Sequence, residues 1–366
     1  MTLADSNKKI VMIGASFTTR GGVTSVVNNY RQAGLFKEWP IVYIETHVDG
    51  NKLEKLIVAF SALLRFAIML LQRKVVLLHA HTAERTSFWR KSIFMLIAFS
   101  VRCPVIFHSH APEFTQFYFK ENGPIARWFV RFILDHAARV IVLSSQWKTA
   151  FSAITKNPNI VCIFNPVAAE GAVGLPQQQR APILLFLGRL GERKGIYDLV
   201  EAVAKARLNF PDVQLLCGGD GDLDGIAKRI EEMGISRSVR ILGWVTGEEK
   251  QRLLAEAAVY VLPSYNEGLP MSVLEAMAAG LPVITTTVGG IPDAVQDNVE
   301  GYLLEPGDVN GLSHAIETLL ADSGLREKMG VAGRNKVSAQ FVPELILPKV
   351  AALYRELGIT PNTQDR

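Results

Sequence analysis

Cysteine is scarce in this 366-residue chain, and its pattern excludes two kinds of cross-link. The three cysteines are odd in number, far apart and set among apolar residues: Cys103, Cys162 and Cys217. They predict neither a disulfide framework nor a metal knuckle. A reducing cytoplasm is the compartment that such cysteine usage fits best.

Long apolar runs are also missing. The nearest approach to a membrane span, Leu56 to Leu71, is interrupted by Ser61 and Arg65. It is also shorter than the roughly 20 residues that cross a bilayer. We therefore expect a helix there, without a span. Met1 to Lys9 is polar, so no secretory signal is expected.

Charged residues make up only 20% of the chain and hydrophobic residues 49%, which indicates a globular α/β protein. The chain is longer than the chains that usually fold around a single hydrophobic core, so two domains are expected. Residues 1–166 hold 20 Lys and Arg against 9 Asp and Glu, a net +11, and the remaining 19 against 26 give −7. The basic half indicates an anionic partner, either a membrane or a nucleic acid. No nucleic-acid module is recognisable, so nucleic acid is not expected.

Short apolar runs alternate with helix-length segments, which is typical of parallel sheets. Six runs precede Pro166: Ile10–Gly14, Ile41–Glu45, Val75–His79, Val105–His108, Val140–Leu143 and Ile160–Ile163. Six more follow Ala181: Ile183–Leu187, Val213–Cys217, Val239–Leu242, Val259–Leu262, Pro282–Thr285 and Tyr302–Leu304. We predict two Rossmann-like, doubly wound domains with ligands in a central cleft. The predicted divisions are an N-terminal domain 1–166, a linker 167–181, a C-terminal domain 182–341 and a helical segment 342–366 that can return to the first domain.

The most informative stretch is Ser264 to Asp293, where a strand ends, a loop follows and Pro270 opens a helix. Glu267 lies in the loop and Glu275 eight residues later, in the first turns of the helix. The free N–H groups and positive dipole end of that helix suit a diphosphate. A carboxylate beside it can accept hydrogen bonds from ribose or sugar hydroxyls.

This stretch resembles the retaining glycosyltransferases of family 4, whose hallmark is two glutamates separated by seven residues. It reads Glu267-Gly268-Leu269-Pro270, then Glu275-Ala276-Met277-Ala278-Ala279-Gly280-Leu281-Pro282-Val283. The resemblance implies a GT-B fold and no metal requirement. It also implies that Glu275 holds the nucleotide ribose, with Gly268, Leu269 and Pro270 beside the donor, and that Glu267 contacts the transferred sugar.

Arg189 and Lys194 stand five residues apart after the first strand of the second domain. Cations there can hold a diphosphate, and a surface loop with incidental basic residues is the alternative. By resemblance to the family, this pair neutralises the leaving nucleoside diphosphate.

Two glycine-containing loops of the second domain complete the expected donor site. Gly218 to Asp222 contains a D-x-D pattern that metal-dependent transferases use, but it closes a strand and resembles the Gly-Asp-Gly turn of the family. We therefore predict a tight turn and no metal. Gly243, Trp244 and Val245 correspond by resemblance to the loop that borders the base, although Trp244 could equally be packing.

In the first domain, Gly21 and Gly22 follow the opening strand and leave the backbone free to approach a ligand. The pattern is not G-x-G-x-x-G, which argues against a dinucleotide fold. By resemblance, this loop closes over the donor phosphates or the acceptor, and a simple turn is the alternative.

Four histidines form two H-x-H pairs at neighbouring strand ends: His79, His81, His108 and His110. They invite a zinc interpretation, but no cysteine or acidic cluster accompanies them. His110 matches the family histidine near the reacting sugar, whereas His79 and His81 are expected to be structural. Asn165 is expected at the hinge before the linker.

The reaction that the resemblance implies is transfer of a hexosyl group from a UDP- or GDP-sugar to a hydroxyl, with no cofactor. The acceptor expected is polyprenyl-diphosphate-linked or a polysaccharide, in envelope lipopolysaccharide or exopolysaccharide synthesis at the inner face of the cell membrane. Two alternatives are an epimerase or hydrolase of GT-B shape and a non-catalytic binding subunit.

Membrane contact is the last expectation. Three helix-length segments mix large apolar residues with cations: Lys52–Lys74, Arg85–Arg102 and Ile125–Arg139. Helices on an anionic bilayer have this composition, and so do helices that cover a parallel sheet. We expect peripheral contact with an anionic membrane.

Overall fold

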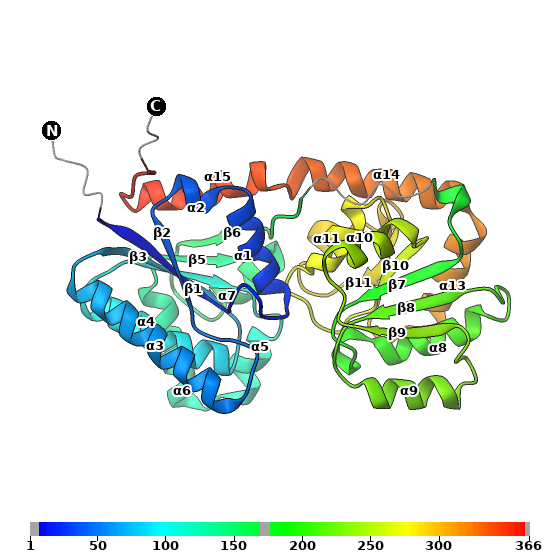
Figure 1. Ribbon diagram of the computed structural model, residues 1–366, viewed down its shortest axis with the longest axis horizontal. Coiled ribbons are helices and arrows are strands. Elements are labelled where there is room, and N and C mark those ends of the chain that lie inside the picture. Colours follow the sequence, from blue (N-terminus) through cyan, green and yellow to red (C-terminus); the bar gives the residue numbers. More distant parts are fainter. Residues whose placement is uncertain (1–6, 169–175, 363–366) are drawn as a thin grey trace. The chain divides into compact units, whose positions relative to one another are not determined.

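The computed structural model describes residues 7–168 and 176–362, so part of the expected linker 167–181 lies outside the described residues (Figure 1). The chain forms two compact units. Unit 1 combines the chain up to Pro166 with the chain from Pro343 onward, and unit 2 comprises Val167–Val342. Both units are α/β, as the alternating apolar runs predicted.

Unit 1 contains a parallel sheet of six strands in the order β2-β1-β3-β4-β5-β6. The strands are β1 (Lys9–Gly14), β2 (Ile41–Glu45), β3 (Val75–Thr82), β4 (Val105–Ser109), β5 (Arg139–Val142) and β6 (Ile160–Cys162). The helices are α1 (Gly22–Gln32), α2 (Leu35–Glu38), α3 (Lys52–Leu71), α4 (Thr86–Ser100), α5 (Phe114–Gln116), the π-helical turn Phe117–Glu121, α6 (Pro124–His136), α7 (Ser145–Ser152) and α15 (Pro343–Glu356).

Unit 2 contains a second parallel sheet of six strands, in the order β12-β11-β10-β7-β8-β9. The strands are β7 (Ile183–Leu187), β8 (Gln214–Gly218), β9 (Val239–Gly243), β10 (Val259–Leu262), β11 (Val283–Thr286) and β12 (Gly301–Leu304). The helices are α8 (Ile196–Ala206), α9 (Leu223–Glu232), α10 (Gly247–Glu256), α11 (Met271–Ala278), α12 (Ile291–Ala294), α13 (Val309–Ala321) and α14 (Ser323–Gln340), with short 3-10 turns at Gln177–Gln179 and Glu192–Lys194.

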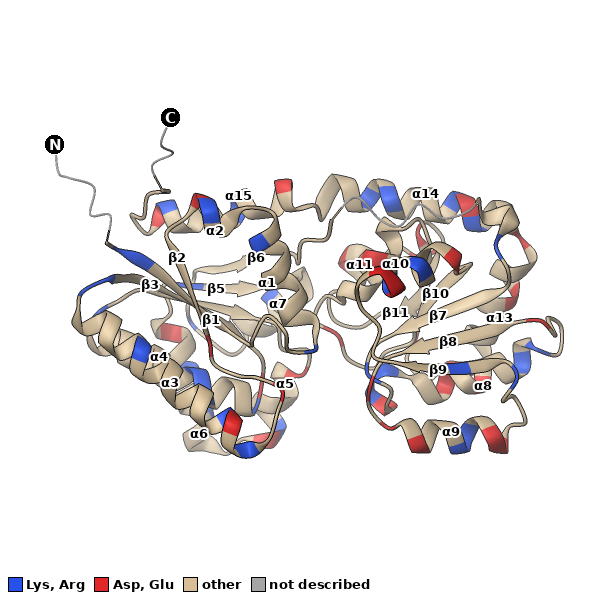
Figure 2. Cartoon of the chain, in the orientation of Figure 1, with Lys and Arg blue, Asp and Glu red and all other residues tan. Residues whose placement is uncertain are grey.

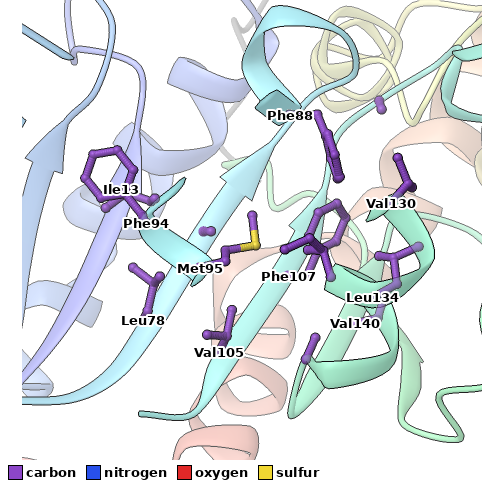
Figure 3. Close-up of a cluster of buried hydrophobic side chains, with 14 of the residues drawn as sticks. Ile13, Leu78, Phe88, Phe94, Met95, Val105, Phe107, Val130, Leu134 and Val140 are labelled. Atoms are coloured by element: carbon purple, nitrogen blue, oxygen red, sulfur yellow. The ribbon is translucent and has the colours of Figure 1, made fainter. Parts of the chain in front are cut away.

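The core of unit 1 forms where helices cover the central strands. Val105 and Phe107 of β4 pack with Phe88 and Met95 of α4 and with Leu134 of α6 (Figure 3). All five side chains are buried. Continuous apolar strands are required here because strands in the middle of a parallel sheet are covered on both faces.

Each sheet reverses its strand order at one point, and this point positions the candidate site. The reversal lies between β1 and β3 in unit 1, and between β7 and β10 in unit 2. In doubly wound sheets, ligands bind beyond the carboxyl ends of the strands at such a switch point. The loops that follow β7 and β10 are therefore the first place to look in unit 2.

The C-terminal helix α15 packs in unit 1. The hydroxyl of Tyr354 lies 2.8 Å from Nδ1 of His79, and Arg139 donates to Glu356 at 2.9 Å. The helix expected at Leu56 to Leu71 is α3. No helix among residues 7–168 and 176–362 has both the length and the apolar character that a bilayer crossing needs.

Candidate active site

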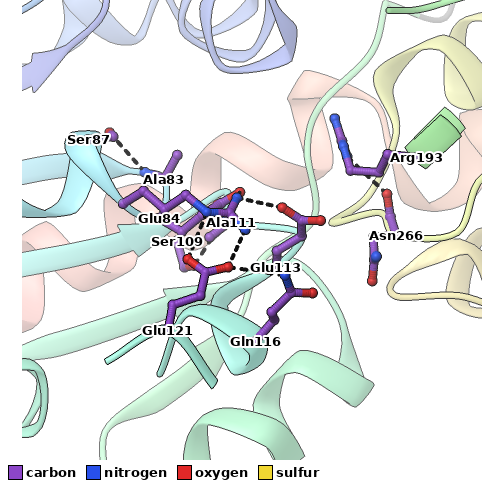
Figure 4. A network of polar contacts seen from close by, with 11 residues as sticks. Ala83, Glu84, Ser87, Ser109, Ala111, Glu113, Gln116, Glu121, Arg193 and Asn266 are labelled. Carbon is purple, nitrogen blue, oxygen red and sulfur yellow. Dashed lines mark hydrogen bonds and ion pairs between the residues drawn. The ribbon is translucent and has the colours of Figure 1, made fainter. Parts of the chain in front are cut away.

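The switch point of unit 2 brings together the charged residues singled out in its sequence. Arg189 and Lys194 follow β7, and Glu267 follows β10, the neighbouring strand. Their loops are joined by hydrogen bonds, since the Tyr265 amide donates to the Arg193 carbonyl at 2.9 Å. The Arg193 guanidinium donates in turn to the Asn266 carbonyl at 3.1 Å (Figure 4).

Glu267 is a buried carboxylate with a cation beside it. Glu267 is 5% exposed, and its Oε1 lies 2.5 Å from Nζ of Lys194. The hydroxyl of Ser264 donates to the same oxygen at 2.7 Å. A buried carboxylate requires such partners, because leaving it unpaired would cost several kcal/mol. Two of these three residues were predicted from sequence, and Ser264 was not.

Glu275 lies on α11 and pairs with a residue that the sequence did not indicate. Its Oε1 is 2.7 Å from Nζ of Lys250, on α10. Both side chains are partly exposed, so solvent reaches this pair. Lys250 belongs to a helix rich in charged residues, and nothing in its local sequence distinguishes it from the others.

Three glycines allow the loops around these charges to approach closely. A Cβ on Gly195 would lie 2.0 Å from the Pro263 carbonyl oxygen, and one on Gly219 would lie 1.8 Å from that of Gly188. A Cβ on Gly289 would lie 1.8 Å from the Glu267 carbonyl oxygen. These close backbone contacts hold the loops around Glu267 in place, and they leave no room for a side chain at any of the three glycines.

The remaining donor-site candidates of unit 2 divide into exposed and buried residues. Arg189 is exposed, and Trp244 is 37% exposed beside Gly243, whose φ is +73°. Val245 is buried, and a Cβ on Gly218 would lie 3.0 Å from its side chain, which indicates packing. Gly268, Leu269 and Pro270 are buried and lead into α11, and no described side chain caps this helix.

The D-x-D pattern has a structural use. Asp222 caps α9 by accepting from the Gly225 amide at 3.1 Å, and it accepts from the Tyr197 hydroxyl at 2.5 Å. The hydrogen bond from Tyr197 lowers the pKa of Asp222 and raises the pKa of Tyr197 to about 12. The tight turn that we predicted for Gly218 to Asp222 is not found, because Gly221 forms an isolated parallel bridge with Leu190 and the Leu190 amide donates to the Asp220 carbonyl.

In unit 1, the loop after β1 leaves space at two glycines. Gly21 has φ +141°, a conformation that favours glycine, and Gly22 begins α1. A Cβ at either position would meet no atom within 4 Å. The loop follows the strand at the switch point of this sheet.

The four histidines form a buried column on β3 and β4 and in the residue after β4. Nε2 of His79 lies 3.2 Å from Nδ1 of His108, and Nδ1 of His81 lies 2.8 Å from Nε2 of His110. Burial lowers the pKa of His79 and of His110 to about 3, and holds the pKa values of His81 and His108 well below the usual value. The imidazoles are therefore neutral near pH 7.

Three of these histidines are close enough to hold a metal. Ligand atoms of His79, His81 and His108 lie within 4.8 Å of one another. However, nitrogens of His79 and His108 face each other, and the other nitrogen of His79 faces the Tyr354 hydroxyl. These contacts indicate a structural role for His79. His110 lies in the same column and is 8% exposed.

Two further polar features of unit 1 follow strands of its sheet. Arg85 forms ion pairs at 2.5 Å with Glu113 and with Glu121 (Figure 4). These hydrogen bonds raise the pKa of Arg85, and they tie the loop after β3 to the loop after β4. Asn165 is buried just before the end of this part of unit 1.

Comparison with known families agrees with this geometry. The family described as "Glycosyl transferases group 1" matches residues 173–336, and the "Glycosyl transferase 4-like domain" matches residues 31–166. The chain belongs to these glycosyltransferases. The resemblance drawn from the two glutamates is thereby confirmed, because the two matches together cover most of both units.

The relatives include enzymes of several pathways. LpsE of Rhizobium meliloti, a lipopolysaccharide core biosynthesis glycosyltransferase, is 35% identical over 49% of this chain and 52% of its own. The chain thus spans about half the length of this curated relative. An alpha-D-kanosaminyltransferase of Streptomyces kanamyceticus is 25% identical over 70% of this chain and 71% of its own.

Solved structures establish the fold. HepE of Anabaena, solved with UDP and glucose, matches with a TM-score of 0.76 at 18% identity, over 95% of this chain and 100% of its own. Sucrose-phosphate synthase of Thermosynechococcus elongatus matches with a TM-score of 0.78 at 24% identity, over 96% and 99%. The fold is GT-B, as predicted.

Proposed function

We propose that the protein is a retaining glycosyltransferase that moves a hexosyl group from a UDP- or GDP-sugar to a hydroxyl. The observation that carries this proposal is the pair of carboxylate–lysine contacts in unit 2, Lys194 with Glu267 and Lys250 with Glu275. The first pair lies between the loops after β7 and β10, and the second joins α10 to α11. HepE, a protein of the same fold, was solved with UDP and glucose.

In the proposed complex, the donor diphosphate lies near the beginning of α11 and the cations that follow β7. Arg189 and Lys194 stabilise the charge that develops on the leaving diphosphate. Glu275 accepts hydrogen bonds from the ribose, and Glu267 accepts them from the transferred sugar. Gly268, Leu269 and Pro270 border the diphosphate, and Gly243 and Trp244 border the base.

We propose retention through a front-face route. The bond between the anomeric carbon and the phosphate oxygen breaks, and the acceptor oxygen bonds to the same face of that carbon. The acceptor proton passes to the leaving phosphate oxygen. In this route Glu267, whose Oε1 accepts from Lys194 and Ser264, forms no covalent bond to the sugar.

The acceptor belongs to the same proposal. A polyprenyl-diphosphate-linked glycan or a polysaccharide is an acceptor that suits the basic residues of unit 1. His110, Gly21 and Gly22 would lie beside this acceptor. We place the enzyme at the inner face of the cell membrane in envelope or exopolysaccharide synthesis. The name of LpsE, which refers to lipopolysaccharide core biosynthesis, supports this context.

A transfer assay tests the function. The protein is incubated in EDTA with a panel of UDP- and GDP-hexoses and an envelope lipid extract, and glycosylated product is detected by mass spectrometry. We expect one donor to give product, and NMR of that product to show the donor's anomeric configuration. A donor epimerised or hydrolysed at the same rate without acceptor, or a product of inverted configuration, would contradict the proposal.

A further inference from the structure

Unit 1 carries an apolar face made by α3, α4 and α6, three helices that lie near one another in Figure 1. On α3, seven large apolar side chains are between 44% and 84% exposed: Leu53, Leu56, Ile57, Phe60, Leu64, Ile68 and Leu71. Their spacing of three and four residues puts them in one stripe along the helix. A soluble helix normally turns such a stripe toward the core.

The orientation of α3 is the unusual feature. Its buried positions are Ala62 and Phe66, which lie on the side opposite Phe60 and Leu64 at 3.6 residues per turn. The helix is therefore apolar on both sides. One side packs on the core of unit 1, and the other points outward along the length of the 20-residue helix.

The neighbouring helices continue this face. On α4, Trp89, Ile93 and Leu96 are exposed at the same helical spacing. On α6, Ile125 is 84% exposed and Trp128 is 61% exposed. An apolar hollow lies between the two helices, and its lining includes Trp89, Ile125 and Trp128. Tryptophans at the edge of an apolar surface are typical of the boundary between lipid headgroups and acyl chains.

The charged side chains along α3 are mostly cations. Lys52 and Lys55 lie at the beginning of α3, Arg65 in its second half, and Arg73 and Lys74 just after its end. Within the described ranges 7–168 and 176–362, no ion pair engages any of these five side chains. The one acidic residue of α3, Glu54, is held in the capping box with Asn51. Figure 2 shows α3 mostly tan, with few acidic residues.

Two arginines add to this positive border. Arg73 and Arg102 follow the ends of α3 and α4 with φ values of +53° and +57°, and both are exposed. Glycine adopts this left-handed conformation at lower energy than a residue with a Cβ. Both positions nevertheless carry a cation at the border of the apolar face.

We propose that the face formed by α3, α4 and α6 docks on the surface of an anionic lipid bilayer, with α3 lying in the membrane plane. The apolar stripe enters the boundary between headgroups and acyl chains, and the surrounding cations bind lipid phosphates. A second copy of this chain would bring the same uncompensated cations to the contact, whereas an anionic membrane neutralises them. The inference rests on the proposed membrane location and names the surface responsible, but it does not require the donor site.

Vesicle co-sedimentation of the full chain tests this inference. The probe is phosphatidylcholine vesicles containing about one-third phosphatidylglycerol, with pure phosphatidylcholine for comparison. We expect the wild type to bind the anionic vesicles. Phe60→Glu combined with Leu64→Glu should weaken binding at least about tenfold, because two side chains of the stripe become charged. Arg65→Gln should weaken binding to anionic vesicles about fivefold and leave binding to neutral vesicles unchanged.

The controls distinguish binding through this face from nonspecific binding to vesicles and from effects of the donor site. Leu208→Glu alters a leucine of unit 2 that is 82% exposed, and it should bind vesicles like the wild type. Glu275→Gln should also bind normally, so loss of the donor site is distinguishable from loss of docking. Wild-type protein that ignores anionic vesicles would overturn the inference. A Phe60→Glu, Leu64→Glu protein that binds them equally well, or a wild-type dimer that this double variant dissociates, would overturn it as well.

Discussion

Lys194→Met is expected to lower kcat/KM for transfer by about 10²- to 10³-fold, the usual effect of removing one group that stabilises a developing negative charge. The same change removes the cation that lies 2.5 Å from the buried Glu267 carboxylate. Breaking such a pair costs about 3 kcal/mol of folding stability, because a buried charge is left without compensation. The two effects have different causes, and a second variant separates them.

The double variant Lys194→Met, Glu267→Gln makes this separation. The neutral amide that replaces the carboxylate needs no cation, so the free energy of unfolding should return most of the way to the wild-type value. Activity should remain at least as low as in the single variant, because neither substituent can stabilise the leaving group. Steady-state kinetics and urea unfolding measure the two quantities. Lys205→Met, which alters a lysine with a 44% exposed side chain on α8, is the matched control for loss of a cation.

Full activity in the double variant would show that Lys194 acts only by neutralising Glu267. A single variant within about twofold of wild-type kcat/KM would show that Lys194 does not stabilise the reacting groups, against the loss expected for such a cation. Either result would remove Lys194 from the proposed mechanism. Unchanged stability in the single variant would instead contradict the buried ion pair itself.

Acid is expected to destabilise unit 1 far more steeply than surface histidines would allow. The four histidines of the buried column have pKa values below the ordinary 6.5 in the folded state because of desolvation. A depressed folded pKa contributes stability that is present above pH 6.5 and is lost as the pH falls. At pH 5.5, keeping each buried histidine neutral costs roughly 1 to 2 kcal/mol relative to the unfolded chain, and the four together cost several kcal/mol.

Urea unfolding at pH 7.5 and pH 5.5, followed by tryptophan fluorescence, measures this loss. Four of the five tryptophans, Trp39, Trp89, Trp128 and Trp147, belong to unit 1, so the signal reports mainly on that unit. His108→Gln should reduce the loss by roughly a quarter, since one of the four titrating groups is removed. His314→Gln, on the surface of unit 2, should leave it unchanged. A loss of less than about 1 kcal/mol in the wild type would mean that the column is protonated in the folded protein.

The sequence predicted the strands of both units well, for a physical reason. Strands covered on both faces must be apolar throughout, so runs such as Ile183–Leu187 and Val259–Leu262 coincide with β7 and β10. The order of the strands was not predictable in the same way. Which strands neighbour one another depends on the crossover connections, and the adjacency of β7 and β10 follows only from the folded chain.

The candidate site was predictable in part. Glu267, Glu275 and Lys194 stand in a recognisable pattern, but the partners Ser264 and Lys250 do not. Lys250 lies 25 residues before Glu275, on another helix, and the packing of α10 near α11 brings them together. The burial of individual residues was not predictable either. The sequence around Val245 is compatible with an exposed or a buried side chain, and in the structure the side chain is buried.

The outward stripe of α3 was not predicted either. Apolar residues recur along α3 with the period of a helix, whichever of its sides covers the sheet. The pattern therefore predicts a helix but does not predict which side is buried. The fold decides this through Ala62 and Phe66. The sequence indicated cations mixed with apolar residues, and the structure adds which of the apolar ones remain exposed.

Binding of UDP and GDP, measured by titration calorimetry in EDTA, tests the central claim that unit 2 is a nucleotide-sugar donor site. We expect metal-free binding of one of the two nucleotides, and at least about tenfold weaker binding by Glu275→Gln, which loses the carboxylate that we propose binds the ribose. Glu256→Gln, which alters a partly exposed glutamate at the end of α10, should bind like the wild type. Binding of neither nucleotide by the folded wild type, or equal binding by Glu275→Gln, would contradict this claim.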